Sequence, residues 1–152
     1  MINQQDEANV VMAPASYSAA GTSVFTFDCR GFRYCEVDVI FGALATNGGV
    51  PSVCRISESD ATVISNFTTI TGGSATLAAA ALGGSVVKFQ IDLRSRKRYL
   101  NLDLTNGTTT VVIGAVAKLT RPETSKLTAA QQSITNLAST STTAVNQIVR
   151  LT

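Results

Sequence analysis

Apolar and polar residues alternate most clearly between Ser85 and Leu119, in three successive segments. A period of two residues is typical of extended strands that bury one face, because successive side chains point to opposite sides. The pattern therefore predicts three β-strands, separated by a basic break and a turn. The residues predicted to face the core are Val87, Phe89, Ile91 and Leu93, then Leu100, Leu102 and Leu104, then Val111, Ile113, Ala115, Ala117 and Leu119.

A turn signal lies between the second and third of these segments, at Asn106 and Gly107. A type I′ turn needs positive φ at both central residues, and Asn and Gly tolerate that conformation best. The dipeptide therefore predicts a β-hairpin that joins the two segments.

Similar alternation predicts further strands earlier in the chain. Residues 22–29 place Phe25, Phe27 and Cys29 on one face, and residues 34–44 alternate in the same way. Residues 53–58 and 63–70 are expected to form shorter strands, while the cluster at residues 10–12 is expected to dock as an edge strand on the sheet or on another subunit. Seven or eight strands between Thr22 and Leu119 are typical of a sandwich or jelly roll.

The sequence thus predicts an all-β protein, an antiparallel β-sandwich that is jelly-roll-like and carries an extended C-terminal arm. We divide the chain into an N-terminal segment (1–21), a β-sandwich domain (22–122) and a C-terminal arm (123–152).

The arm is rich in Ala, Ser, Thr, Asn and Gln, with scattered apolar residues. These are too few for a second core and too many for a solvated linker. Either the arm orders on another protein surface, with a helix possible at residues 129–138, or it is a frayed tail. Under the first interpretation, the candidate contact residues are Leu127, Ile134, Leu137, Val145, Ile148 and Leu151.

Composition narrows the classes of partner. Only 14% of residues are charged and the formal net charge is +2, which is small for a protein that must neutralise many phosphates. No apolar run approaches the roughly 18 to 20 residues of a membrane span, and the first residues lack the features of a signal peptide. We therefore expect neither nucleic acid nor a membrane as partner, and synthesis in the cytosol.

Residues for catalysis are scarce. The chain contains no histidine, so Ser–His–Asp and Cys–His catalysis cannot be assembled, and it has no phosphate-binding glycine motif. Glu36 with Asp38 could act as a paired acid and base or hold a cation, and Glu58 with Asp60 lie at a strand end, although solvated surface charges are the commoner explanation. We expect no enzymatic activity and no cofactor.

Cysteines 29, 35 and 54 do not form a disulfide framework. Buried reduced thiols are the expected state, with an incidental Cys29–Cys35 bridge as the alternative. Zinc is not expected, because the chain has neither a CxxC pair nor a histidine.

One short run concentrates positive charge between two predicted strands. It can be a solvated or structural turn, a contact with an acidic protein partner, or a nucleic-acid contact with Tyr99 stacking on a base. The candidate contact residues are Arg94, Arg96, Lys97 and Arg98.

Several segments together resemble a known class of proteins: FTFD, YCEVDVIFGAL, FQIDL, KRYLNLDLTNGTT and VVIGAVAKLTRPE. The pattern, over residues 22–123, is similar to that of the β-sandwich cement (decoration) proteins of tailed-bacteriophage capsids. The resemblance implies a homotrimer that binds major capsid proteins on the outside of the virion, after synthesis in the cytoplasm of a bacterial host. The alternative is a phage head-fibre or tail-associated receptor- or glycan-binding module.

Overall fold

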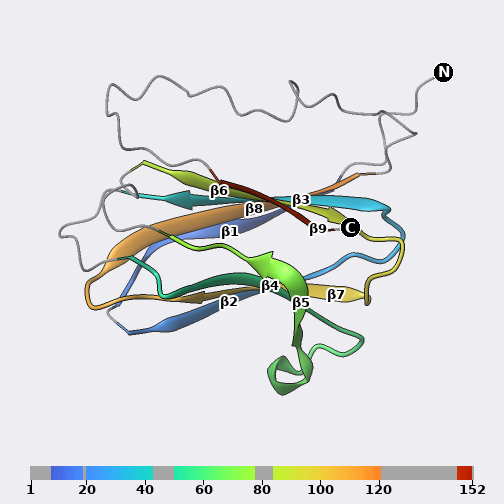
Figure 1. Cartoon of the computed structure of the whole chain (residues 1–152), viewed down its shortest axis with the longest axis horizontal. Helices are drawn as coiled ribbons and strands as arrows, with labels where there is room; N and C mark the ends of the chain where they lie inside the picture. Colours follow the sequence, from blue (N-terminus) through green and yellow to red (C-terminus); the bar gives the residue numbers. More distant parts are fainter. Residues whose placement is uncertain (1–7, 19, 43–49, 78–83, 121–146, 152) are drawn as a thin grey trace.

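The computed structural model describes residues 8–18, 20–42, 50–77, 84–120 and 147–151, which form two stacked β-sheets (Figure 1). The five-stranded sheet has the order β1-β8-β3-β6-β9, and the four-stranded sheet has the order β2-β7-β4-β5. The elements are β1 (Ala8–Tyr17), β2 (Thr22–Asp28), β3 (Tyr34–Phe41), β4 (Val53–Ser59), the 3-10 helix η1 (Ile64–Asn66), β5 (Thr68–Ser74), β6 (Val86–Asp92), β7 (Tyr99–Thr105), β8 (Val111–Thr120) and β9 (Gln147–Leu151).

Most connections cross from one sheet to the other. From β1 to β8, only β4 and β5 follow each other within the same sheet. All pairings among these eight strands are antiparallel, and β9 adds a parallel strand beside β6. Two four-stranded sheets with this interleaved order form a jelly roll. The predicted fold class, an all-β antiparallel sandwich of the jelly-roll type, is therefore confirmed.

The core lies between the sheets and follows the alternation of the sequence. In β3, Cys35, Val37, Val39 and Phe41 are at most 1% exposed. All the residues predicted to face the core in β2, β6, β7 and β8 are likewise buried. Because the side-chain period is two, a shift of one residue would place each of these sets in water.

The predicted hairpin at Asn106 is wrong, because the two strands that flank it lie in different sheets. β7 pairs with β2 and β4, whereas β8 pairs with β1 and β3. Neither Asn106 nor Gly107 has positive φ; among described residues other than glycine, only Ala20 does. The Asn106 side chain instead donates a hydrogen bond to the carbonyl of Ser18 at 3.0 Å. This turn carries the chain from one sheet to the other.

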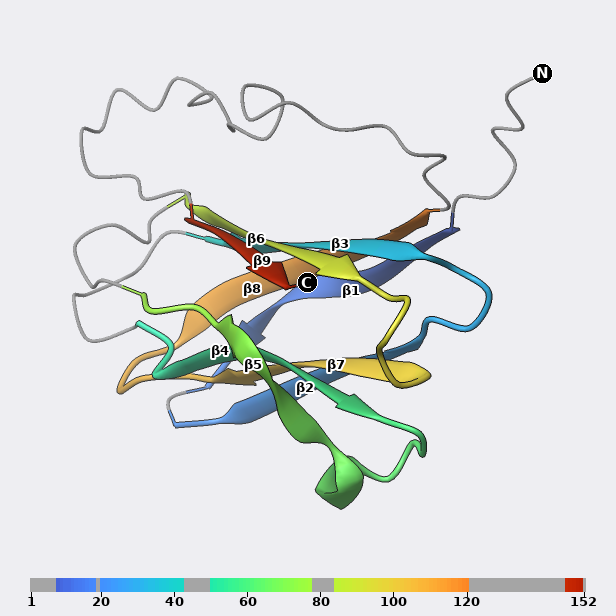
Figure 2. The same ribbon diagram turned by 45° about the vertical axis from the view of Figure 1, so that its right-hand side comes forward.

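The predicted strand over residues 63–70 is wrong in its first half. Residues 64–66 form η1, and the strand that follows, β5, extends to Ser74. Val63 is 56% exposed and Ile64 is 49% exposed, so the apolar run that suggested a strand is not buried. Figures 1 and 2 show this segment projecting from the four-stranded sheet. Apolar composition here does not correspond to burial in the core.

Strands from both terminal segments belong to the five-stranded sheet. β1 is an edge strand that pairs with β8, which confirms docking on the sheet for residues 10–12. In β9, Ile148 lies opposite Lys88 and Leu151 lies opposite Ile91 of β6. Leu127, Ile134, Leu137, Val145 and the possible helix at residues 129–138 lie outside the described residues. Whether the arm contacts another protein stays a prediction.

The expected state of the cysteines is confirmed, because Cys29, Cys35 and Cys54 are free and buried. Burial raises the pKa of Cys29 to about 12 and that of Cys54 to about 12, and it raises the pKa of Cys35 as well. Since the thiolate is the reactive form, these groups should be inert in the folded protein.

Thiol labelling at mildly alkaline pH should therefore distinguish folded from unfolded chains. We expect a maleimide to modify the folded protein at least about 1,000-fold more slowly than the denatured protein, because labelling requires an opening that costs several kcal/mol. Mass spectrometry should find three modified cysteines only after denaturation. Rapid labelling of one cysteine in the folded protein would contradict its burial.

Candidate functional site: a basic pocket at one end of the sandwich

Two turns meet at one end of the sandwich, namely the β2–β3 turn and the β6–β7 turn (Figures 1 and 2). The backbone N–H of Cys29 donates to the carbonyl of Arg98 at 2.9 Å, and that of Leu93 donates to the carbonyl of Arg33 at 2.9 Å. These hydrogen bonds join residues that are 69 and 60 positions apart in the sequence. They place the predicted basic run beside two further arginines, Arg30 and Arg33.

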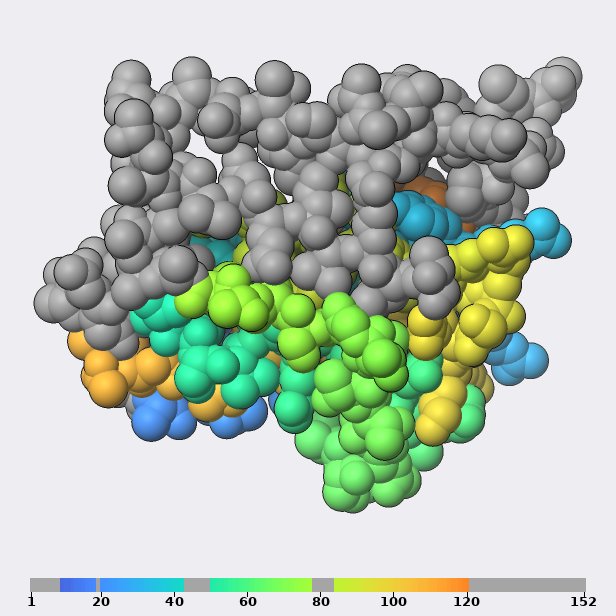
Figure 3. All heavy atoms as spheres, viewed as in Figure 1, coloured from blue at the N-terminus to red at the C-terminus, as the bar shows by residue number. Residues whose placement is uncertain are grey.

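A pocket of about 330 Å³ lies between the two turns. Its apolar wall includes Cys29 and Leu93, which are buried, and Phe32, which is partly buried. In Figure 3, the β6–β7 turn (yellow) forms the right-hand end of the molecule, with atoms of the β2–β3 region (blue) beside it. The lining residues are Cys29, Arg30, Gly31, Phe32, Leu93, Arg96, Lys97 and Arg98. We call this site the basic pocket.

Arg98 is held by an acidic residue of β2. Its Nε donates to the two carboxylate oxygens of Asp28 at 3.2 and 3.1 Å, and its Nη2 donates to Oδ2 at 2.7 Å. The hydrogen bonds from Arg98 lower the pKa of Asp28. The guanidinium also lies 4.8 Å from the ring centroid of Tyr99, a cation–π contact. Arg98 therefore has an intramolecular role as well as a place in the pocket.

Arg94 is separated from the other members of the basic run. Its Nε donates to Asp92 Oδ1 at 3.0 Å and to Oδ2 at 2.9 Å, and Arg94 does not line the basic pocket. The hydrogen bonds from Arg94 lower the pKa of Asp92. Of the four basic residues predicted as contacts, the structure thus brings Arg96, Lys97 and Arg98 together and leaves Arg94 outside.

Glu58 and Asp60 hold the backbone of the basic turn. Glu58 accepts a hydrogen bond from the N–H of Lys97 at 3.2 Å, and Asp60 accepts one from the N–H of Arg98 at 3.4 Å. A carboxylate oxygen of Glu58 also lies 3.8 Å from Nη1 of Arg96. These two carboxylates, which the sequence places at a strand end, therefore position the turn.

Arg30 and Phe32 were not predicted as site residues. The sequence marks residues 30–33 as a turn, but no local signal shows that this turn meets residues 93–98. Within the described ranges, neither the guanidinium of Arg30 nor the ammonium of Lys97 makes a hydrogen bond or a close ion pair, although the charge of Arg30 adds to the hydrogen bonds from Arg98 in lowering the pKa of Asp28. These two cationic groups are therefore available to an acidic ligand at the basic pocket.

Glu36 and Asp38 face a lysine on the outer face of the five-stranded sheet. Lys88 Nζ contacts Glu36 Oε1 and lies 3.0 Å from Asp38 Oδ1, while Gln90 Nε2 donates to Glu36 at 3.2 Å. Burial raises the pKa of Asp38, and the hydrogen bond from Lys88 opposes that rise. The ammonium thus occupies the position between the carboxylates where a cation would bind.

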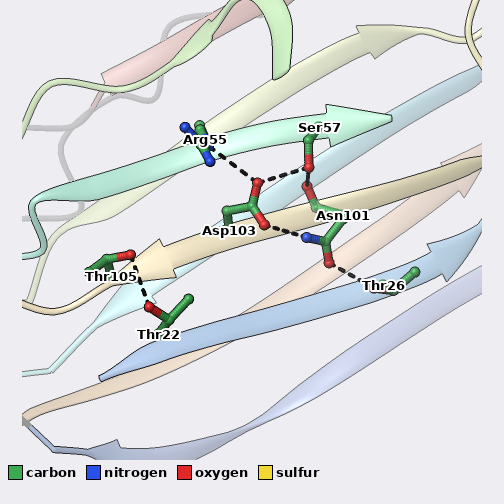
Figure 4. A network of polar contacts seen from close by, with 7 residues as sticks. All are labelled: Thr22, Thr26, Arg55, Ser57, Asn101, Asp103 and Thr105. Carbon is green, nitrogen blue, oxygen red and sulfur yellow. Dashed lines mark hydrogen bonds and ion pairs between the residues drawn. The ribbon is translucent and has the colours of Figure 1, made fainter. Parts of the chain in front are cut away.

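A polar network covers the outer face of the four-stranded sheet (Figure 4). Thr26 donates to the side-chain oxygen of Asn101 at 2.7 Å, and Asn101 donates to Asp103. Asp103 also accepts from Ser57 at 2.8 Å and from Arg55 at 3.3 Å. Asn101 is 0% exposed and Ser57 is 1% exposed. Because these polar groups satisfy one another across β2, β7 and β4, the network stabilises the sheet.

The outer face of the five-stranded sheet divides into a charged half and an apolar half. Glu36, Asp38 and Lys88 belong to the charged half. The apolar half, here called the apolar patch, comprises Val11, Pro14, Ile40, Val86, Val112 and Val116. Strand register places Val11 beside Val116 and Ile40 beside both Val86 and Gly114, and Pro14 approaches Gly114 closely.

The apolar patch is open to solvent. Val11 is 62% exposed, Ile40 is 48% exposed and Val112 is 41% exposed. Single exposed apolar residues are ordinary, whereas larger contiguous patches are typical of surfaces that bind another molecule. The patch therefore joins the basic pocket as a candidate contact surface.

Neither metal nor membrane features accompany these surfaces. In the described part of the chain, no group of three or more His, Cys, Asp or Glu residues is placed to hold a metal ion. No helix among the same residues is long and apolar enough to span a bilayer. Comparisons with protein families, with curated proteins and with solved structures found no match for this chain.

Proposed function

We propose that this chain is a non-enzymatic virion structural protein that binds the outside of a phage capsid and stabilises contacts between major capsid proteins. The apolar patch is the observation that carries the proposal, because it is an exposed apolar surface on the outer face of the five-stranded sheet. The resemblance of residues 22–123 to capsid cement proteins supports a major capsid protein as the partner. The jelly-roll fold is compatible with this role.

The apolar patch can supply binding energy without chemistry. Fully burying one Val or Ile side chain is worth about 1.5–3 kcal/mol. Val11, Ile40 and Val112 are about half exposed, so each has roughly half of that still to gain. A homotrimer would present three copies of the patch to a symmetric capsid, and the linked contacts would raise the avidity.

Capsids that lack this protein provide the direct test. We expect the purified chain to sediment with such capsids and to raise the temperature at which they rupture. Light scattering should give three times the chain mass of 15.9 kDa if the trimer forms before binding. Replacing Val11 and Ile40 together with Asp should weaken capsid binding by at least about 100-fold, because two charges would be buried at the interface.

The matched control carries Asp at Val24 and Val63, which are 45% and 56% exposed and lie away from the apolar patch. This variant should bind capsids like the original chain, and thiol labelling should verify that both variants fold. Equal loss of binding in the two variants would contradict the assignment of the patch. Binding to host cells without binding to capsids would favour the receptor-binding alternative.

A further inference from the structure

We propose that the basic pocket binds an acidic peptide segment of the protein partner, with a carboxylate among the cationic groups and a neighbouring apolar side chain against Phe32 and Leu93. The identity of the partner rests on the proposed function, whereas binding of such a peptide does not. The proposal depends on the charge, the lining and the volume of the pocket.

Positive charge is in excess at this end of the molecule. The cationic residues of the two turns are Arg30, Arg33, Arg94, Arg96, Lys97 and Arg98, and the carboxylates beside them are Asp28, Glu58, Asp60 and Asp92. The local excess equals the formal net charge of the whole chain, +2. An acidic ligand is therefore attracted to this end, and the attraction should weaken as salt is added.

The geometry of the pocket shows that its cations can hold carboxylates. Asp28 already binds Arg98 through both oxygens, and Glu58 lies near Arg96. Arg30 and Lys97 line the same pocket, and among the described residues their charged groups have no such partner. Because arginine binds a carboxylate through paired N–H groups, Arg30 suits a Glu or Asp side chain.

The apolar lining of the pocket indicates a ligand that has an apolar group beside its negative charge. Phe32, Leu93 and Cys29 are apolar residues that line the pocket of about 330 Å³. Filling the site with an inorganic anion would leave the exposed part of Phe32 against water, whereas an apolar side chain would cover it. An acidic residue next to an apolar one satisfies both parts of the lining.

Nucleic acid fits the same site less well. The ring predicted to stack on a base, Tyr99, does not line the pocket, and the guanidinium of Arg98 lies 4.8 Å from the ring centroid. Arg98 and Arg94 are also engaged by Asp28 and Asp92. A peptide carboxylate is therefore the better match to the free cationic groups.

The test is a titration of the full chain, followed by amide NMR, with the acetylated and amidated peptide Glu-Leu-Glu. We expect saturable shifts at Gly31, Phe32 and Lys97, and no comparable shifts with the peptide Gln-Leu-Gln. Lys97→Glu should raise the dissociation constant at least about tenfold, because it places a carboxylate in the pocket. Arg94→Glu changes the net charge equally but lies outside the pocket, so it should change the constant by less than about threefold.

Equal effects of Lys97→Glu and Arg94→Glu would overturn the proposal, since binding would then reflect net charge alone. Equal binding of the two peptides would also overturn it, as would displacement by inorganic phosphate at the same concentration as the peptide. Capsid sedimentation separates the two proposals. Peptide binding without capsid binding refutes the proposed function and supports the pocket, whereas capsid binding without peptide binding does the reverse.

Discussion

Replacing Phe89 with alanine is expected to lower the free energy of unfolding by about 3–5 kcal/mol. The ring is 0% exposed and lies in β6, whose strand partners at this position are Val37 on β3 and Val149 on β9. Removing it takes away buried apolar surface and leaves a cavity that the two sheets can close only in part. Denaturant unfolding should show a lower midpoint with an unchanged slope, and the melting temperature should fall by about 10 °C.

Phe67 provides the matched control for this substitution. It is only partly buried, and it lies outside the hydrophobic cluster between the sheets. The same change from phenylalanine to alanine should therefore cost less than about 1.5 kcal/mol there. Equal losses at Phe67 and Phe89 would contradict the placement of β6 in the core.

The sequence predicted which side of each strand is buried, because that information is local. Val37, Phe89 and Leu102 follow a period of two, and only one face of each strand can meet the core. Strand pairing is not local in the same way. β6, β7 and β8 follow one another in the chain but alternate between the two sheets, so neighbouring segments in the sequence are not neighbours in a sheet.

The sequence predicted only part of the candidate site, because it shows local features and not which distant segments meet. The charge of Arg96, Lys97 and Arg98 is visible in a short stretch of sequence, and these residues do line one pocket. Arg30 and Phe32 reach that pocket only because the jelly-roll topology brings two distant turns together. The apolar patch was likewise not predicted, since Val11 and Ile40 belong to strands that are separated in sequence and joined through β8.

Asn106 has the sequence signature of a hairpin turn, but in this fold its role is to make hydrogen bonds to the β1–β2 turn. Substitution of Asn106 tests that role. Asn106 is 3% exposed, its side chain donates to the Ser18 carbonyl at 3.0 Å, and its backbone N–H donates to the Gly21 carbonyl at 2.9 Å. We expect Asn106→Ala to lower the free energy of unfolding by about 0.5–1.5 kcal/mol, because the hydrogen bond from this buried amide to the Ser18 carbonyl is lost. Denaturant unfolding measures this loss.

Substitutions by small residues distinguish the two roles of this turn. A hairpin of type I′ would tolerate Asn106→Gly and would be strained by Gly107→Ala, because both of its central residues need positive φ. In the jelly roll, neither residue has positive φ, so Gly107→Ala should change stability by less than about 0.5 kcal/mol. Asn106→Gly should instead be at least as harmful as Asn106→Ala, since it removes the same amide and adds backbone freedom. If Gly107→Ala cost more stability than Asn106→Gly, the turn would behave as a type I′ hairpin. The expected result, a larger loss at Asn106, would show that the Asn106 side chain links the β1–β2 turn to the connection between β7 and β8.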